Sequence, residues 1–231
     1  MKLIAIPYAF GNASAFSDLF NVLDNDIKKT TIEYPGHGSR FSEELLCDMD
    51  EIVNDAAVQV ISQIDSNEDY CLLGYSMGGI VAYELYYKLL SKHCKLPTHL
   101  FILGSSEPGH DTERKDYENY NTEQIKEELL EHDATPKELY ESEEFLELYS
   151  PIVKSDNIAL RDYKPTKRNL PIKCGVTVMR GSEEKNTENC RSGWEEFIGH
   201  PCKYHLIEGG HFFLFDDNNL NLVAKIIENE I

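Results

Sequence analysis

Residues 70–79 of this 231-residue chain read Tyr-Cys-Leu-Leu-Gly-Tyr-Ser-Met-Gly-Gly, and this stretch decides the fold that we predict. An apolar run leads into a Gly-x-Ser-x-Gly turn around Ser76, and an amphipathic segment follows over residues 80–90. Strand, sharp turn and helix in this order are the setting of a nucleophile elbow. The two glycines have a mechanical reason, because the serine backbone is strained and flanking side chains would collide with the turn. The turn also directs the Met77 N–H toward the place where an oxyanion would form.

Strand-like and helix-like segments alternate along most of the chain. The predicted strands are residues 2–6, 30–34, 70–73, 98–104, 171–180 and 203–207. The predicted helices between and after them are residues 15–23, 51–64, 80–90, 189–198 and 220–227. Such alternation favours a mostly parallel sheet with helices on both faces. We therefore predict one α/β domain of the α/β-hydrolase type over residues 1–231.

The character of the chain changes after residue 104. Residues 105–150 carry 15 acidic against 4 basic side chains, and apolar residues are sparse. Helical patches over residues 123–131 and 139–148 are broken, in this interpretation, at Pro136 and Pro151. We predict an inserted helical lid over about residues 105–151, which should be mobile because it buries little apolar surface.

Composition excludes several classes of partner. A formal net charge of −19 argues against nucleic acid and anionic membrane surfaces. No apolar run approaches the roughly 20 residues that span a bilayer, and the apolar start is too short before Pro7 for a signal peptide. We therefore expect a cytoplasmic protein and a monomer. The six cysteines are scattered without metal-ligand spacing, so we expect free thiols and no metal.

A serine nucleophile needs a base and a group that orients the base. His211 is the best of the eight histidines, because it follows the last predicted strand on a Gly-Gly turn. The acid should lie on the loop after the preceding strand, where Glu183 and Glu184 are both possible by position. Asp156 and Asp216 are weaker candidates.

The loop after Pro7 is the predicted source of the second oxyanion donor, since small residues and a glycine follow the first strand directly. The backbone N–H groups near Ala9 and Phe10 are the candidates. His37 also follows a strand, but it sits on a Pro-Gly turn, and a structural or rim role is favoured for it.

Five stretches, in order along the chain, together resemble one known family. They are Ile6-Pro7-Tyr8-Ala9-x-Gly11-x-Ala13, Tyr34-Pro35-Gly36-His37-Gly38-x-Arg40, Gly74-Tyr75-Ser76-Met77-Gly78-Gly79, Ser150-Pro151-Ile152-Val153-Lys154-Ser155-Asp156 and Gly209-Gly210-His211-Phe212-Phe213. The chain resembles the type II thioesterases, the stand-alone α/β hydrolases that accompany nonribosomal peptide and polyketide synthases.

The resemblance implies a role for each matching residue. Ser76 would be the nucleophile, His211 the base and Glu184 the acid, at a position where the family has aspartate. The oxyanion hole would use the N–H of Met77 and one from Ala9 or Phe10. Phe10 stands where the family has glycine, which would narrow the site. Tyr75 replaces a family histidine, a change that we expect to be tolerated.

The implied activity is hydrolysis of acyl or peptidyl thioesters from the phosphopantetheine arm of carrier proteins, which clears stalled synthases. The arm belongs to the carrier, so the resemblance implies no cofactor. We expect the lid to gate entry of the arm, and docking to use apolar lid residues and a basic spot at Lys164, Lys167 and Arg168. The alternatives are a carboxylesterase, a medium-chain fatty-acyl thioesterase, and a non-catalytic hydrolase-like binding protein, which the glutamate at the acid position leaves open.

Overall fold

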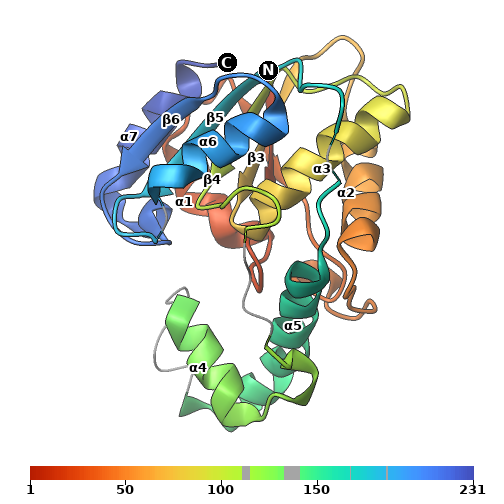
Figure 1. Cartoon of the computed structure of the whole chain (residues 1–231), viewed down its shortest axis with the longest axis vertical. Coiled ribbons are helices and arrows are strands. Elements are labelled where there is room, and N and C mark those ends of the chain that lie inside the picture. The colour runs from red at the N-terminus through yellow and green to blue at the C-terminus, as the bar shows by residue number, and fades with distance from the viewer. Residues whose placement is uncertain (111–114, 133–140, 167, 186) are drawn as a thin grey trace.

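The computed structural model describes residues 1–110, 115–132, 141–166, 168–185 and 187–231 (Figure 1). Within these residues, one six-stranded sheet has the order β2-β1-β3-β4-β5-β6, and every neighbouring pair is parallel. The strands are β1 (Lys2–Ile6), β2 (Lys28–Thr31), β3 (Tyr70–Tyr75), β4 (His99–Leu103), β5 (Gly175–Gly181) and β6 (Lys203–Ile207). The α/β prediction is confirmed, and the sheet is parallel throughout its described part rather than mostly so.

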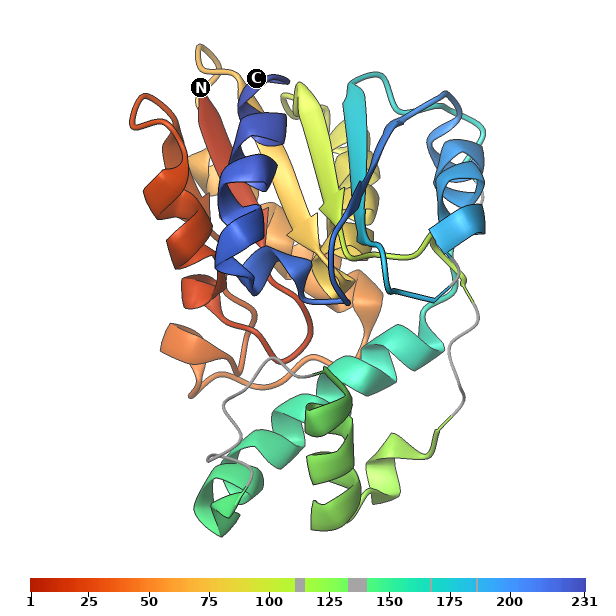
Figure 2. The same ribbon diagram turned by 90° about the vertical axis from the view of Figure 1, so that its left-hand side faces the viewer.

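Helices cover both faces of the sheet, so the strands are buried from two sides (Figures 1 and 2). One face carries α1 (Ser17–Val22) and α7 (Asp217–Glu228); the other carries α2 (Met49–Gln63), α3 (Met77–Ser91) and α6 (Thr187–Ile198). Successive residues of β1 belong to different halves of the core: Leu3 and Ala5 pack with α1 and α7, whereas Ile4 and Ile6 pack with α2 and α3. Since alternate residues point to opposite faces and both faces are covered, these four successive residues are all buried. Such strands therefore read as continuous apolar runs.

Two further helices, α4 (Thr122–His132) and α5 (Glu143–Asp162), lie between β4 and β5 in the sequence. We call them the helical cap. They project beyond the carboxyl ends of the strands, away from the layers that cover the sheet (Figures 1 and 2). The cap has a small apolar cluster of its own, formed by Ile125, Leu129, Leu146 and Val153. Its position beside the strand ends brings it close to the predicted site.

The predicted helix break at Pro151 is wrong, because α5 continues through this proline to Asp162. Proline removes one N–H from a helix, but tertiary packing can outweigh that loss. Here Leu146 before the proline and Ile152 and Val153 after it are all buried, so one apolar face runs across Pro151. The Ser150 hydroxyl donates to the Leu146 carbonyl at 2.6 Å and satisfies an acceptor nearby. The predicted break at Pro136 lies outside the described residues.

None of the helices in the described part of the chain combines the length and the apolar character that a membrane crossing needs.

The turn that ends β3 tolerates no side chain at Gly74. A Cβ atom there would lie 2.0 Å from the Gly78 carbonyl oxygen. We expect Gly74→Ala to lower the free energy of unfolding by about 3 kcal/mol or more, since the clash is with backbone that cannot move aside. Gly210→Ala is the matched control, because a Cβ there meets nothing within 4 Å. Thermal denaturation followed by circular dichroism measures both, and equal melting temperatures would contradict the prediction.

Candidate active site

Ser76 stands on the sharp turn between β3 and α3. Its backbone has φ 51° and ψ −116°, a strained conformation of the kind that places a nucleophile above a sheet. The Ser76 N–H donates to the Leu103 carbonyl of the neighbouring strand at 2.8 Å, which fixes the turn. Met77 is the first residue of α3, where backbone N–H groups have no partner within the helix.

The structure joins three of the predicted site residues in one hydrogen-bonded chain. His211 Nε2 lies 3.0 Å from Ser76 Oγ, and His211 Nδ1 lies 2.9 Å from Glu184 Oε2. An ionised carboxylate only accepts hydrogen bonds, so Nδ1 donates to Glu184. The neutral ring then presents a bare Nε2 to the serine hydroxyl, which is the tautomer that can accept its proton.

Backbone contacts between two loops place the glutamate under the histidine. The Ser182 N–H donates to the Ile207 carbonyl at 2.7 Å, and the Glu183 N–H donates to the Gly209 carbonyl at 3.0 Å. The loops approach so closely that a Cβ on Gly181 would lie 2.1 Å from the Gly210 carbonyl oxygen. Within this arrangement the Glu183 side chain is exposed, whereas that of Glu184 is only 7% exposed.

Arg180, which the sequence analysis did not single out, holds the same carboxylate. Its Nη2 lies 3.2 Å from Glu184 Oε2, and the two side chains are 4% and 7% exposed. The other carboxylate oxygen, Oε1, accepts the Gly181 N–H at 2.8 Å. The guanidinium also donates to Ser106 Oγ at 3.1 Å and to the Lys185 carbonyl at 3.1 Å. The carboxylate is therefore held at both oxygens, which compensates for the greater freedom of a glutamate side chain compared with aspartate.

We expect Arg180→Gln to lower kcat for thioester hydrolysis by about 10- to 100-fold, the worth of one buried hydrogen bond to a charged group. The reason is that Glu184 loses a partner that orients it toward His211. Introducing the same change into a Glu184→Gln background should cost little more, because the two residues act through one contact. Additive losses in this double-mutant cycle would show that Arg180 acts elsewhere.

Tyr75 is a second residue whose contribution the sequence did not reveal. Its ring is fully buried, and its hydroxyl donates to the His211 backbone carbonyl at 2.6 Å. The ring also stacks on Phe212, with 6.0 Å between centroids. The side chain thus fixes the backbone that carries the imidazole. The sequence signal that could have indicated this role is the position of Tyr75 directly before Ser76 in the Gly-x-Ser-x-Gly turn, which lies beside the loop that carries His211.

The two backbone N–H groups predicted as oxyanion donors on the loop after β1, those of Ala9 and Phe10, have different surroundings. The Phe10 N–H donates to Asp156 Oδ2 of α5 at 2.7 Å, so it is directed at a carboxylate. Ala9 is 5% exposed on the loop after β1, and the Tyr34 hydroxyl donates to the Pro7 carbonyl at 2.9 Å. With the Phe10 amide engaged, Ala9 is the better candidate donor of this loop.

The two weaker candidates for the acid are engaged elsewhere. Asp156 binds Phe10 and His37, and Asp216 accepts from the Asn218 N–H as the N-cap of α7.

A cavity of about 500 Å³ opens beside Ser76, His211 and Glu184. Its lining also includes two basic residues near the end of α5, Arg161 and Lys164. Arg161 pairs with Glu118 at 2.7 Å and with Asp162 at 2.8 Å, so acidic neighbours offset its charge. Lys164 is exposed. The nucleophile and an exposed lysine therefore line the same cavity.

Arg168 does not belong to a free basic spot. It pairs with the buried Glu84 at 2.5 Å, and its guanidinium carbon lies 4.9 Å from the centre of the Tyr87 ring. Lys167 lies outside the described residues. Of the three cations predicted to dock a partner, Lys164 is the one that the structure places at the cavity.

Within the described residues, no three His, Cys, Asp or Glu side chains are grouped closely enough to hold a metal ion.

The fold and this arrangement of serine, histidine and glutamate are those of a serine-type α/β hydrolase. The family model described as Thioesterase domain matches residues 1–231, and the chain belongs to that family.

Similar proteins come from more than one kind of biosynthesis. The chain is 28% identical over 217 residues to the gramicidin S biosynthesis protein GrsT of Aneurinibacillus migulanus, covering 94% of this chain and 84% of the relative. It is 30% identical over 236 residues to the medium-chain S-acyl fatty acid synthase thioesterase of Homo sapiens, covering 98% and 85%. The RedJ thioesterase from the prodiginine pathway of Streptomyces coelicolor has a similar fold, with a TM-score of 0.86, 23% identity and coverage of 100% and 90%.

Proposed function

We propose that this chain is a stand-alone type II thioesterase that hydrolyses acyl or peptidyl groups from the phosphopantetheine arms of carrier proteins in a nonribosomal peptide or polyketide synthase. One observation carries the proposal: Ser76, His211 and Glu184 form a continuous hydrogen-bonded chain at a cavity of about 500 Å³. The similarity to the gramicidin S biosynthesis protein supports the choice of synthase.

In this proposal Ser76 is the nucleophile and His211 the general base. Ser76 Oγ attacks the thioester carbonyl carbon while His211 Nε2 takes the hydroxyl proton. The N–H groups of Met77 and Ala9 hold the oxyanion. The C–S bond then breaks, and the thiol of the arm leaves with the proton from His211. A water molecule, deprotonated by His211, attacks the acyl-serine; the acid departs and Ser76 regains its proton. Glu184 stabilises the imidazolium in both halves of the reaction.

The cavity suits the chemistry of the arm. Phosphopantetheine carries two amides and ends in a phosphodiester, so it favours a polar channel with positive charge at its far end. The lining of the cavity includes Ser105 and Ser106 as well as Lys164. Lys164 is thus the residue that we propose contacts the phosphodiester.

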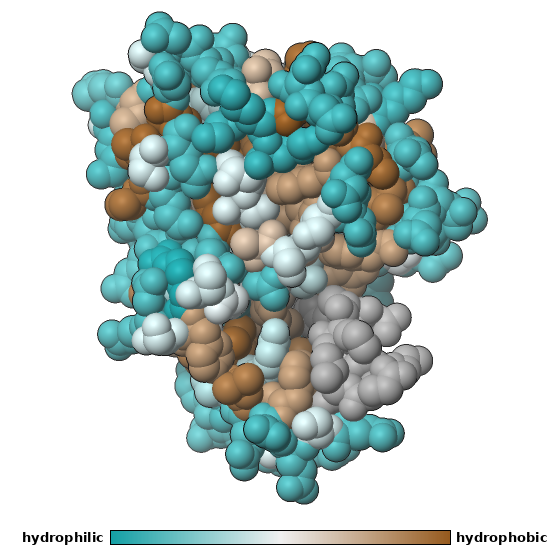
Figure 3. Space-filling model, turned by 180° about the vertical axis from the view of Figure 1, so that it is seen from behind, coloured by the Kyte–Doolittle hydropathy of each residue, from teal (hydrophilic) through white to brown (hydrophobic). Residues whose placement is uncertain are grey.

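The helical cap is the proposed docking surface and gate for the carrier. Most of the charged residues of this segment are acidic, which disfavours electrostatic attraction to a carrier that is itself acidic. Leu130 of α4 and Leu148 of α5 are, however, 40% and 49% exposed. Hydrophobic side chains appear among hydrophilic ones at the cap end of the molecule in Figure 3. We propose that apolar contacts here, together with Lys164, hold the carrier.

The discriminating experiment compares kcat/KM for three substrates with the same acyl group: a carrier-bound thioester, a free coenzyme A thioester and a p-nitrophenyl ester. The proposal expects the carrier-bound thioester to be preferred. It expects Lys164→Glu to lower kcat/KM for the two substrates that carry phosphopantetheine and to leave kcat/KM for the p-nitrophenyl ester unchanged. A preference for the nitrophenyl ester would indicate a carboxylesterase. The absence of a fluorophosphonate adduct at Ser76 would indicate a non-catalytic binding protein.

A second candidate function has direct support from the human relative, which is a medium-chain fatty acid synthase thioesterase. The same assay distinguishes it when the acyl chain on the carrier is varied. Efficient release of medium-length acyl chains, with no hydrolysis of aminoacyl or short acyl groups, would favour the fatty-acyl function over the editing function.

A further inference from the structure

A buried carboxylate on the cap helix α5 contacts two segments of the α/β body. Asp156 is 2% exposed, and its Oδ2 accepts the Phe10 N–H at 2.7 Å and faces His37 Nε2 at 3.0 Å. Phe10 belongs to the loop after β1, and His37 to the Pro-Gly turn that follows β2. One oxygen atom of Asp156 therefore joins α5 to two segments that lie 146 and 119 residues away in the sequence.

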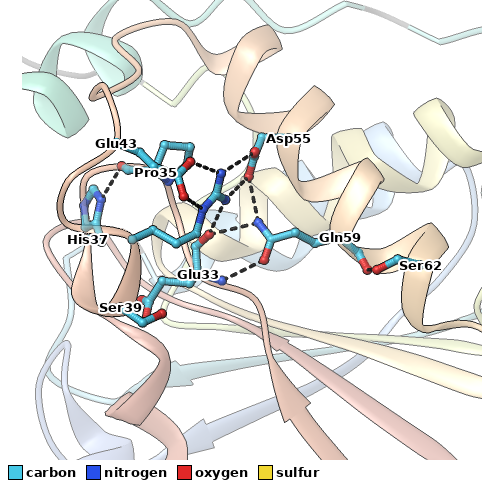
Figure 4. Close-up of polar contacts among 9 residues, drawn as sticks. Glu33, Pro35, His37, Ser39, Glu43, Asp55, Gln59 and Ser62 are labelled. Atoms are coloured by element: carbon cyan, nitrogen blue, oxygen red, sulfur yellow. Dashed lines mark hydrogen bonds and ion pairs between the residues drawn. The ribbon is translucent and has the colours of Figure 1, made fainter.

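The His37 ring is placed to be a cation. It is 3% exposed, and its Nδ1 lies 2.9 Å from the Pro35 carbonyl oxygen (Figure 4). A carbonyl oxygen can only accept, so Nδ1 carries a proton, and Nε2 faces a carboxylate that also only accepts. The ring satisfies both neighbours when both nitrogens are protonated.

The surroundings of His37 favour this charge. Burial lowers the pKa of His37, but the charge and the hydrogen bond of Asp156 outweigh burial, so the pKa is raised from its ordinary value of 6.5. The Pro35 carbonyl and the Glu33 charge act in the same direction. When protonated, His37 forms a buried ion pair with Asp156.

Phe10 ties the loop after β1 to the cap by its side chain as well as by its N–H. Its φ of +67° is unusual for a residue with a side chain, so the surrounding contacts must hold it there. The ring packs both against the main core and against the cap cluster of Ile125, Leu129, Leu146 and Val153. The neighbouring residue, Ala9, carries the N–H that we assign to the oxyanion hole.

We propose that Asp156 is a positioning residue: by holding the Phe10 N–H it orients the adjoining Tyr8–Ala9 peptide, whose Ala9 N–H binds the oxyanion, and His37 is its counter-ion. The oxyanion hole would then depend on the position of α5. This inference rests on the proposed function. Because Asp156 binds the N–H of Phe10, the residue after the donor, a shift of α5 moves Phe10 and with it the adjoining peptide that carries the Ala9 N–H. The His37 charge matters because an uncompensated carboxylate beside the oxyanion hole would oppose the developing negative charge.

The test uses the full chain and a small acyl-N-acetylcysteamine thioester, which needs no carrier docking. Asp156→Asn removes the charge and replaces one acceptor with a donor. We expect kcat to fall by about 10- to 100-fold, somewhat less than the loss of a whole oxyanion donor, while KM changes less than about twofold. Binding of an acyl trifluoromethyl ketone, which forms a tetrahedral adduct with Ser76, should weaken by a similar factor. Glu147→Gln, an exposed acid on the same helix, is the matched control and should leave both unchanged.

A purely structural role makes different predictions. It would lower the melting temperature of Asp156→Asn without changing kcat or ketone affinity of the folded fraction, and that result would overturn the inference. If Asp156→Asn does not fold, His37→Asn supplies the test, since it leaves the Phe10 contact and removes the counter-ion; an unchanged kcat in this folded variant would also overturn the inference. Hydrolysis by the wild-type chain tests the proposed function separately, because the inference concerns only the ratio between variant and wild type.

Discussion

Replacing Ser76 with alanine is expected to lower kcat for an acyl thioester by about 10⁴- to 10⁶-fold, down to the level that binding and the oxyanion hole alone provide. The hydroxyl stands on the strained turn after β3 and lies 3.0 Å from His211 Nε2, within hydrogen-bond reach. Without the hydroxyl no acyl-serine can form, so hydrolysis through the covalent intermediate is lost. Single-turnover release of a radiolabelled acyl group measures the loss.

The control for this variant is Ser62→Ala on the outer side of α2, where the hydroxyl donates only locally to the Gln59 carbonyl. It should retain wild-type turnover and wild-type labelling by a fluorophosphonate. Ser76→Ala should lose the label while its melting temperature stays close to that of the wild type, since alanine also fits the turn. Residual turnover within about tenfold of the wild type would mean that Ser76 is not the nucleophile.

Local sequence patterns predicted most of the sheet because each strand carries its own signal. The segments 2–6 and 203–207 match β1 and β6 residue for residue, since Pro7 stops one and Glu208-Gly209 stops the other. The prediction for the second strand, residues 30–34, is displaced from β2 at Lys28–Thr31. There the β-branched residues at 30–32 continue past Thr31, the last residue that pairs with β1. The β-branched run is therefore longer than the strand on this side.

A site residue could be predicted from the sequence only where its residue type and the sequence around it both indicated the same role. Ser76 on its turn and His211 after the last strand meet that condition. Arg180 and Asp156 do not, because the residue type and the surrounding sequence do not indicate the contact that each makes in the fold. Arg180 lies within β5 and reaches Glu184, which follows four residues later on the loop after the strand. Asp156 reaches Phe10 only because α5 continues past Pro151, which the sequence pattern argued against.

The choice between Glu183 and Glu184 illustrates the same limit. Both follow β5 directly, so position in the sequence does not separate them. The structure separates the two side chains by contact: Glu184 receives His211 Nδ1, Arg180 and the Gly181 N–H, whereas Glu183 is exposed. The Glu184 side chain is 7% exposed and both of its oxygens are bound, so its carboxylate is held in one position. The exposed carboxylate of Glu183 is surrounded by water, which weakens its interaction with any partner.

Glu184→Gln is therefore expected to lower kcat by about 10⁴-fold, while Glu183→Gln leaves kcat within about twofold. The amide keeps the shape of the carboxylate, but it can present an N–H to His211 Nδ1. That contact favours the tautomer with the proton on Nε2, which cannot accept the Ser76 proton, and no charge remains to stabilise the imidazolium. Steady-state hydrolysis of a carrier-bound thioester measures the effect, with circular dichroism to establish that both variants are folded. A larger loss in Glu183→Gln than in Glu184→Gln would assign the acid to the neighbouring residue, and equal small losses would show that His211 works without a carboxylate partner.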